Sequence, residues 1–280
     1  MPIIKSFDDF QTAIVSKRSG CPRVAVVRGT DEATLQAIKQ LSENGIAMPI
    51  CINSANPEED AAEAVAMVNR GEADMIMKGL INTDVLLHAI LDKQKGLVSS
   101  GQILTHISAA SVSTYPKVFF FTDAAVIPYP TQEQRTEQVR YSVQICHRLG
   151  ISEPRIALIH CSEKPSRQFP FVDGYNSIIE HSKRGAFGSC IVDGPLDVKT
   201  ACSLDAQMKK NINSPINGEA DVLIMPDIEA GNIFYKSLTF FAKAKTAGML
   251  CGAKVPIIIP SRGDNAEAKY NSLLFGLATI

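Results

Sequence analysis

The sequence predicts an α/β protein with mainly parallel sheets that carry helices on both faces. Apolar runs of strand length alternate with longer amphipathic segments along the whole 280-residue chain. The composition, 45% hydrophobic and 20% charged, provides enough apolar side chains for a full core. Strands that alternate with helices in this way are typical of parallel sheets, because each crossover helix packs on a sheet face.

The predicted elements follow one another as strand-then-helix units. Pro57 and the acidic residues after it fit the start of one such helix. The predicted strands lie in RVAVVRG (23–29), IAMPICIN (46–53), DMIMKG (74–79), KVFFFTDAA (117–125), RIALIHCSE (155–163), SCIVDGPLD (189–197), ADVLIMPDIEAGN (220–232) and VPIIIPSRG (255–263).

The length of the chain fits one large domain or two of medium size. Eight strands are many for one small sheet, and the proline-bearing stretch VIPYPTQ (126–132) offers a crossover. We therefore predict a boundary near Pro128. The first α/β domain comprises residues 1–127 and 249–280, and the second comprises residues 128–248.

Charge and composition exclude several classes of partner. The formal net charge of -1 gives no general attraction to nucleic acid or to a membrane surface. The N-terminal stretch lacks the pattern of a signal peptide, and no uncharged apolar run approaches the ~20 residues of a membrane span. Seven dispersed cysteines without a C-x-x-C pair indicate reduced thiols. We expect a cytoplasmic protein.

Several motifs of catalysis and cofactor binding are absent from the sequence. It contains no G-x-G-x-x-G, no G-x-x-x-x-G-K-[ST] and no G-x-S-x-G. No cluster of His, Asp, Glu or Cys has the spacing of metal ligands. We therefore expect neither a metal nor an organic cofactor.

The turn in PIIIPSRGDNAEAK (256–269) is the strongest candidate site. Asp264 is the predicted N-cap of the following helix and Glu267 its N3 partner, so both carboxylates have a structural explanation. Arg262 has none. It lies between a buried strand and a helix N-terminus, where the planar guanidinium can hold two oxygens of a phosphate or carboxylate.

Other polar residues lie at the ends of predicted strands, where ligands of open α/β sheets bind. In MPDIEAGNIFYK (225–236), Gly231 and Asn232 fit a helix start, with Asp227 and Glu229 before it and Lys236 about one turn inside. The structural alternatives are an Asn cap, a solvent-facing lysine and, for His106 in a predicted loop, a hydrogen-bonded structural histidine. The candidate binding residues are Lys78, His106, Thr122, Asp123, Asp227, Glu229, Asn232 and Lys236.

Five segments together resemble the phosphate acetyl/butyryltransferases. They are GEADMIMKGL, FFFTDAA, IVDGPLD, ADVLIMPDIEAGNIFYKSL and GAKVPIIIPSRGDNAEAKYNSL, in this order. The VDGP and SR-x-D-x-AE-x-K patterns are more similar to the butyryl branch. The resemblance implies a two-domain fold like that of isocitrate and isopropylmalate dehydrogenases, a homodimer or higher homo-oligomer, and an active site in the interdomain cleft. The implied reaction converts acyl-CoA and phosphate into acyl phosphate and CoA, without a bound cofactor.

The resemblance also implies roles for the residues of the turn. Arg262 would hold the phosphate, and Ser261 would hydrogen-bond the reacting sulfur or carbonyl oxygen. The family's carboxylate base aligns with Ala268 here, so Glu267 and Asp264 are both candidates for the base. Val98 and Thr105 stand where butyryl-type sequences often carry arginine and serine.

Three alternatives remain open at this point. The first is an enzyme of the same class that prefers acetyl-CoA or a branched acyl-CoA. The second is a decarboxylating dehydrogenase, which needs a divalent metal and a nicotinamide. The third alternative is a non-catalytic protein that binds acyl-CoA or a phosphorylated metabolite, for which the departures at Val98 and Ala268 are the reason.

Overall fold

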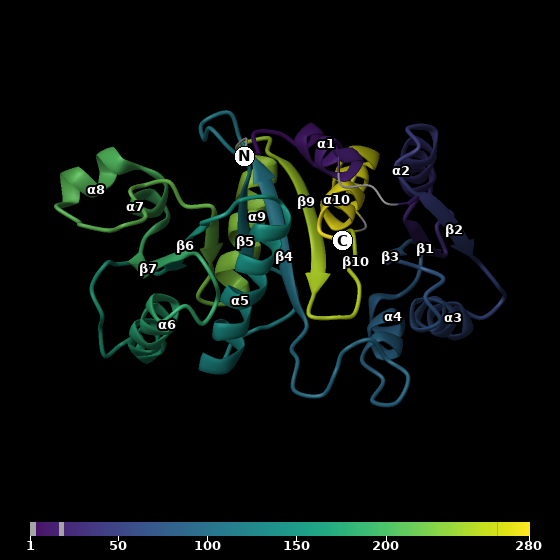
Figure 1. Cartoon of the computed structure of the whole chain (residues 1–280), viewed down its shortest axis with the longest axis horizontal. Helices are drawn as coiled ribbons and strands as arrows, with labels where there is room; N and C mark the ends of the chain where they lie inside the picture. The colour runs from purple at the N-terminus through teal and green to yellow at the C-terminus, as the bar shows by residue number, and fades with distance from the viewer. Residues whose placement is uncertain (1–3, 17–19, 262) are drawn as a thin grey trace. The chain divides into compact units, whose positions relative to one another are not determined.

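Strands and helices alternate along the described part of the chain in the computed structural model (Figure 1). The structure describes residues 4–16, 20–261 and 263–280. The chain divides into two units. The terminal unit comprises Ser6–Leu104 and Lys245–Ile280, and the central unit comprises Thr105–Ala244 with residues 4 and 5.

The terminal unit contains the first and the last helix of the fold. Its strands are β1 (Arg23–Val27), β2 (Met48–Ile52), β3 (Met75–Lys78), β9 (Lys245–Cys251) and β10 (Ile257–Ile258). Its helices are α1 (Asp8–Ser16), α2 (Glu32–Glu43), α3 (Pro57–Asn69), α4 (Thr83–Ile90) and α10 (Ala266–Ala278).

The strands of the terminal unit lie in the order β2-β1-β3-β10-β9. β1 pairs in parallel with β2 and β3, β3 pairs in parallel with β10, and β10 and β9 are antiparallel. Figure 1 shows α2 and α10 on one side of these strands and α3 and α4 on the other. Central strands of such a sheet are buried on both faces, which explains the unbroken apolar runs of β1 and β3.

The central unit is built in the same way. Its strands are β4 (Thr105–Ser111), β5 (Phe119–Thr122), β6 (Arg155–Ile159), β7 (Ile191–Leu196) and β8 (Val222–Ile224). Its helices are α5 (Gln132–Arg148), the short 3₁₀ turn η1 (Pro170–Val172), α6 (Asp173–Lys183), α7 (Val198–Cys202), α8 (Leu204–Lys210) and α9 (Ile228–Phe240).

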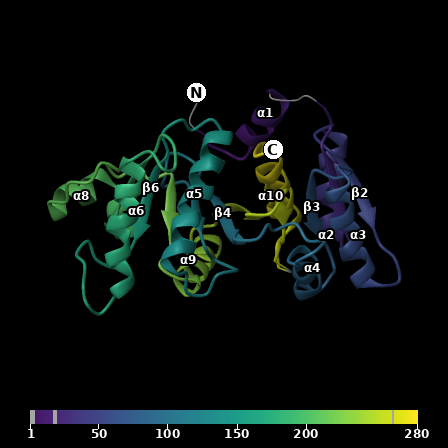
Figure 2. The ribbon, with the colours of Figure 1, turned by 60° about the horizontal axis from the view of Figure 1, so that its bottom comes forward.

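The strands of the central unit lie in the order β4-β5-β8-β6-β7. All of these pairs are parallel except β4 with β5. Phe119 and Phe121 of β5 pack with residues of α9 and of the neighbouring strands in one apolar cluster. α8 lies at one end of the unit in both views (Figures 1 and 2).

The predicted α/β alternation is confirmed, and two further strands are present. Each predicted strand contains an observed one, but β4 and β9 were not predicted. Both contribute the antiparallel pairs, so each unit has mixed parallel and antiparallel strand pairing. Residues 105–127, which the sequence analysis assigns to its first domain, form β4 and β5, and β5 pairs with β8 of the central unit.

No helix in the described ranges is long and apolar enough to cross a membrane.

Candidate active site

The carboxyl ends of β1, β3 and β10 meet at one edge of the terminal unit. These strands are neighbours and parallel, so the loops that follow them leave from the same side of the sheet. Lys78 is the last residue of β3, and Ser261 follows β10 after Ile259 and Pro260. Two predicted site residues, Lys78 and Ser261, therefore lie at the same edge of the sheet.

Ser261 and Asp264 form a hydrogen-bonded turn before α10. The backbone N–H of Ser261 donates to Asp264 Oδ2 at 2.8 Å, and the N–H of Asp264 donates to the Ser261 carbonyl at 3.1 Å. Ser261 is exposed, and among the described residues its side-chain oxygen accepts one long contact, of 3.5 Å, from the N–H of Gly263. Arg262, the predicted phosphate ligand, lies outside the described residues.

The predicted cap of α10 is wrong by one residue. Asn265 is the N-cap, and its side chain accepts the N–H of Ala268 at 2.9 Å. Asp264 instead closes the turn at Ser261, which leaves the adjacent amide to cap the helix. Glu267 does not reach back to the cap, because it forms an exposed ion pair with Lys245 at 2.8 Å.

Lys78 is buried at the end of β3. Only 4% of the residue is exposed, and Nζ donates to the carbonyl of Gly79 at 3.3 Å. A lysine ammonium is costly to bury. Lys78 ends the strand next to β10, which precedes Ser261. This position is consistent with its predicted role as a point charge for phosphate.

Asp123 organises the corresponding strand end of the central unit. Its carboxylate is 2% exposed and accepts hydrogen bonds from the backbone N–H groups of His106, Ala125, Val126 and Ile127 and from the hydroxyl of Thr105. Thr122 lies 3.3 Å from the same hydroxyl, Oγ1 to Oγ1. These contacts give Asp123 and Thr122 a structural role in shaping the loop after β5.

His106 lies in β4 and not in a loop, contrary to the prediction. Its Nδ1 is 3.4 Å from the hydroxyl of Ser108, and its backbone N–H belongs to the Asp123 network at 3.0 Å. The half-buried imidazole thus has the hydrogen-bonded environment of a structural histidine, which was the alternative prediction for His106.

The turn before α9 starts the helix earlier than predicted. Asp227 is the N-cap and accepts the N–H of Ala230 at 2.8 Å, so Gly231 and Asn232 lie inside the helix. Gly231 is required by close packing, because a Cβ there would lie 2.1 Å from the carbonyl oxygen of Asp123. Asn232 Nδ2 donates to the carbonyl of Ala124 at 3.1 Å.

The other two charged residues of this segment, Glu229 and Lys236, lie at the surface. Glu229 accepts the hydroxyl of Tyr129 at 3.2 Å, and this hydrogen bond raises the pKa of Tyr129. Lys236 lies well inside α9, with Nζ 5.4 Å from the centre of the Tyr235 ring. Neither is paired with a strong opposite charge in the described part of the chain, which leaves both accessible to a ligand.

One buried arginine was not among the predicted site residues. Arg135 of α5 is 2% exposed and donates to the carbonyls of Met225 and Pro226, at 3.1 Å each. Its guanidinium lies 5.2 Å from the ring centre of Phe171 and 5.5 Å from that of Tyr175. Burial lowers the pKa of Arg135. The arginine therefore fixes the end of β8, from which Asp227 begins α9.

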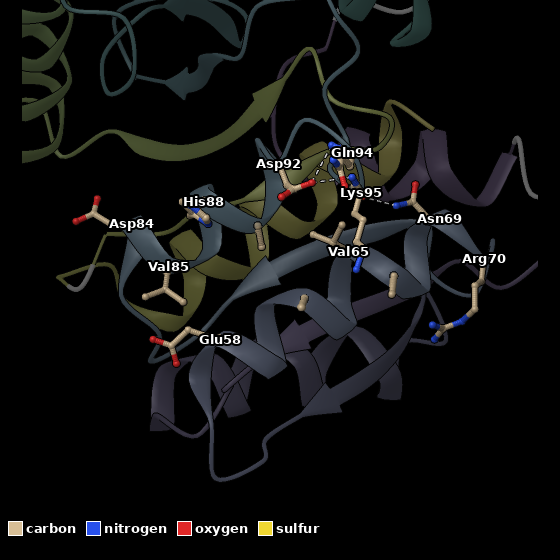
Figure 3. Close-up of a pocket in the computed structure, with 13 residues that line it drawn as sticks. Glu58, Val65, Asn69, Arg70, Asp84, Val85, His88, Asp92, Gln94 and Lys95 are labelled. Carbon is tan, nitrogen blue, oxygen red and sulfur yellow. Dashed lines mark hydrogen bonds between the residues drawn. The ribbon is translucent and has the colours of Figure 1, made fainter.

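A groove of about 770 Å³ lies between α3 and α4 (Figure 3). Its floor is aliphatic, with Val65 and Val85 facing the space and Asp84 and Glu58 near one end. No predicted site residue lines it.

Within the described ranges, no three His, Cys, Asp or Glu side chains come together in a way that could hold a metal ion.

Comparison with known proteins identifies the family. The model of the family described as Phosphate acetyl/butaryl transferase matches residues 52–276. The chain belongs to this family. The resemblance found in the five sequence segments is thereby confirmed, and the protein is a transferase of the phosphate acetyl/butyryltransferase family.

Individual relatives agree with this assignment. A phosphate butyryltransferase from Clostridium acetobutylicum is 33% identical, over 97% of both chains. A phosphate acetyltransferase from Thermotoga maritima is 36% identical, over 78% of this chain and 74% of its own. The crystal structure of a branched-chain phosphotransacylase from Enterococcus faecalis superposes with a TM-score of 0.83 at 29% identity, over 92% of this chain and 98% of its own.

Proposed function

We propose that this member of the phosphate acetyl/butyryltransferase family moves a short-chain acyl group, preferably butyryl, reversibly between CoA and inorganic phosphate. The observation that carries the proposal is the identity of 33% with a phosphate butyryltransferase over almost the whole of both chains. The Ser261–Asp264 turn at the meeting point of parallel strand ends supports it, because such edges bind ligands in α/β proteins.

The proposed chemistry uses no covalent enzyme intermediate. In the direction of acyl-CoA synthesis, the CoA thiolate attacks the carbonyl carbon of the acyl phosphate. The C–S bond forms, the bond from carbon to the phosphate oxygen breaks, and phosphate leaves with the electron pair. Alignment of the two substrates supplies much of the rate, up to about 7–11 kcal/mol in ideal intramolecular models.

Ser261 is the proposed hydrogen-bond donor to the reacting carbonyl oxygen or sulfur. Its hydroxyl is exposed and free of a strong internal partner in the described part of the chain. A fixed donor to a developing oxyanion contributes about 3 kcal/mol. Arg262, the next residue, is proposed from the family resemblance as the ligand of the phosphate.

Asp264 is favoured over Glu267 as the base for the CoA thiol. Asp264 lies in the same turn as Ser261 and has one oxygen, Oδ1, without a partner among the described residues. Glu267 is engaged with Lys245. A free thiol titrates near ~8.5, so a nearby carboxylate is sufficient to assist its ionisation.

The remaining parts of the proposal concern assembly and requirements. We propose a homodimer or higher homo-oligomer that acts on small-molecule substrates in the cytoplasm without a metal or organic cofactor. The exposed apolar side chains of α9 support self-association, and the seven free cysteines are consistent with a reducing compartment.

The function is tested with purified protein and a panel of acyl-CoA substrates. We expect phosphate-dependent release of CoA from butyryl-CoA, unaffected by EDTA and faster than release from acetyl-CoA. Faster turnover of acetyl-CoA or a branched acyl-CoA would assign one of those preferences, which the names of the Thermotoga and Enterococcus relatives make the main alternatives. Binding of CoA without turnover of any acyl-CoA would support the non-catalytic alternative.

A further inference from the structure

Arg28 is held at the candidate edge by a buried carboxylate. It follows the last residue of β1, and its Nη1 donates to Asp60 Oδ2 at 2.7 Å and to the carbonyl of Ser54 at 3.0 Å. Asp60 is 1% exposed, and its other oxygen accepts the N–H of Ser54 at 2.7 Å. The Arg28 side chain is 25% exposed. The carboxylate thus supports the arginine from the protein side.

The opposite edge of this guanidinium is available. Among the residues that the structure describes, Nε and Nη2 of Arg28 have no hydrogen-bond partner. Two other arginines of the terminal unit differ, because Arg23 uses Nε and Nη2 on Asp74, and Arg70 uses them on carboxylates of α3 and of the turn after it. The Nε–Nη2 edge is the planar pair of donors that fits two oxygens of a phosphate.

The backbone fixes where this edge lies. Arg28 has a left-handed φ of 54°, and its carbonyl accepts the N–H groups of Thr30 at 2.9 Å and Leu80 at 2.7 Å. Gly79 packs directly on it, because a Cβ at Gly79 would lie 2.3 Å from the Arg28 carbonyl oxygen. Non-glycine residues hold this conformation only where the surroundings impose it. The turn is therefore rigid on both sides of Arg28.

The strand register places Arg28 beside Lys78 and two strands away from β10, the strand that precedes Ser261. Val27 pairs with Lys78, and Met77 of the same strand pairs with Ile258 of β10. Neighbouring strands are about 4.8 Å apart, so the ends of β1 and β10 are separated by about 10 Å. Two cationic side chains, Arg28 and Lys78, thus stand at successive strand ends on the side where Ser261 lies.

We propose that Arg28 binds a phosphate group of a substrate and that Asp60 holds it in position. The inference rests on the proposed function for the identity of the substrate. The separation of about 10 Å from the Ser261 strand favours a phosphate of CoA that does not react. Inorganic phosphate or the acyl phosphate offers the same chemistry, and the experiment distinguishes these sources.

The test measures binding by calorimetry with CoA, with pantetheine, which lacks the phosphates, and with inorganic phosphate. Arg28→Gln is expected to weaken CoA binding by about 10-fold or more, since it removes a charge-assisted pair of hydrogen bonds. Pantetheine binding should stay within twofold. Arg23→Gln is the matched control, because it removes an arginine from the opposite end of the same strand and should leave every affinity unchanged.

Kinetics separate positioning from folding. Arg28→Gln should raise the KM for butyryl-CoA with kcat within about twofold, and Arg28→Lys should recover part of the loss. Asp60→Asn should raise the same KM by a smaller factor, because the amide still accepts a hydrogen bond from Arg28. Thermal unfolding of each variant reports whether it is folded.

Weaker binding of CoA alone assigns the contact to a CoA phosphate, and weaker binding of inorganic phosphate assigns it to the reacting group. The proposal is overturned if folded Arg28→Gln binds both within twofold of the original, or loses pantetheine affinity to the same extent as CoA affinity. A protein that binds CoA through Arg28 but turns over no acyl-CoA contradicts the proposed function and leaves this inference standing.

Discussion

At the scale of single residues, the exposed hydroxyl of Ser261 is the group whose removal should affect the chemical step most directly. Ser261→Ala should lower kcat by about 100-fold with little change in either KM, because one donor to a developing oxyanion contributes about 3 kcal/mol. The measurement is phosphate-dependent CoA release. Ser99→Ala, in another exposed turn of the terminal unit, is the control. A loss below threefold at Ser261 would remove it from the mechanism.

The choice of base between Asp264 and Glu267 also belongs to this scale. Asp264→Asn should reduce kcat/KM for CoA by about 100-fold, the usual contribution of a general base, while the amide oxygen still closes the turn with the Ser261 N–H. Glu267→Gln should stay within twofold, because its exposed ion pair with Lys245 contributes little. The reverse order of the two effects would assign the base to Glu267.

Sequence reasoning located this turn but not the roles inside it. The sequence pattern fits a helix cap at either Asp264 or Asn265. The hydrogen bonds decide between them, because the N–H of Ser261 donates to Asp264 and leaves Asn265 to cap the helix. Arg28 stands at the end of the first predicted strand, but nothing in the sequence marked its buried partner, and Arg135 had no signal in the sequence. Each lies in a sequence position typical of solvent-exposed residues, and their partners are distant backbone carbonyls or a carboxylate from another element.

At the scale of elements, α10 is anchored to α2 by a partly buried ion pair. Lys269 Nζ lies 2.6 Å from Asp31 Oδ1 and 2.9 Å from the hydroxyl of Thr34. Lys269→Met should lower the free energy of unfolding by about 3 kcal/mol, because it leaves Asp31 with an unpaired charge. Asp31→Asn combined with Lys269→Met should cost less than the sum of the single changes. Urea unfolding at neutral pH measures both, and additive effects would contradict the coupling.

The same ion pair predicts how stability depends on pH. Burial alone would raise the pKa of Asp31, but hydrogen bonds from Lys269 and Thr34 outweigh it and lower the pKa from 3.8 to about 2. A carboxylate whose pKa is lower in the folded protein stabilises the fold at pH values above 3.8, which is its pKa in the unfolded chain. This stability is lost as the pH falls toward 2. Unfolding titrations from pH 5 to pH 2 should therefore show a smaller decline for Lys269→Met. An equal decline in both proteins would exclude Asp31 as its source.

Elements with strong apolar runs were predictable, and those defined by pairing were not. β1 and β3 are recognisable because both faces are buried. β4, with the sequence THISAAS, and β9, with Gly248 inside it, have weak strand propensity. They become strands because an antiparallel neighbour binds their backbone. The start of α9 at Asp227 was missed because Gly231 serves packing against Asp123 and not a cap.

At the scale of the whole molecule, the alternation of strands and helices was sufficient to predict the fold class. Alternation specifies which segments are strands, but it does not specify which strand becomes whose neighbour. β10 lies between β3 and β9, far from both β1 and β2 in sequence, and this insertion brings Ser261 beside Lys78. The site is therefore a product of topology, and only the family resemblance related its separated parts before the structure did.

Self-association is the property that α9 should control. Within α9, Gly231 is the one buried residue, while Ile233 and Phe240 are 65% and 68% exposed and the adjacent Phe241 is 80% exposed. Large apolar side chains gathered at a surface mark interfaces, because water solvates them poorly. We expect light scattering during gel filtration to give at least twice the chain mass of 30.3 kDa at micromolar concentration. Phe240→Ser with Phe241→Ser should shift the protein to the monomer, whereas Leu35→Ser, an exposed leucine of α2, should not. If the unmodified protein is already monomeric, α9 needs another partner, and if the double variant stays associated, the interface lies elsewhere.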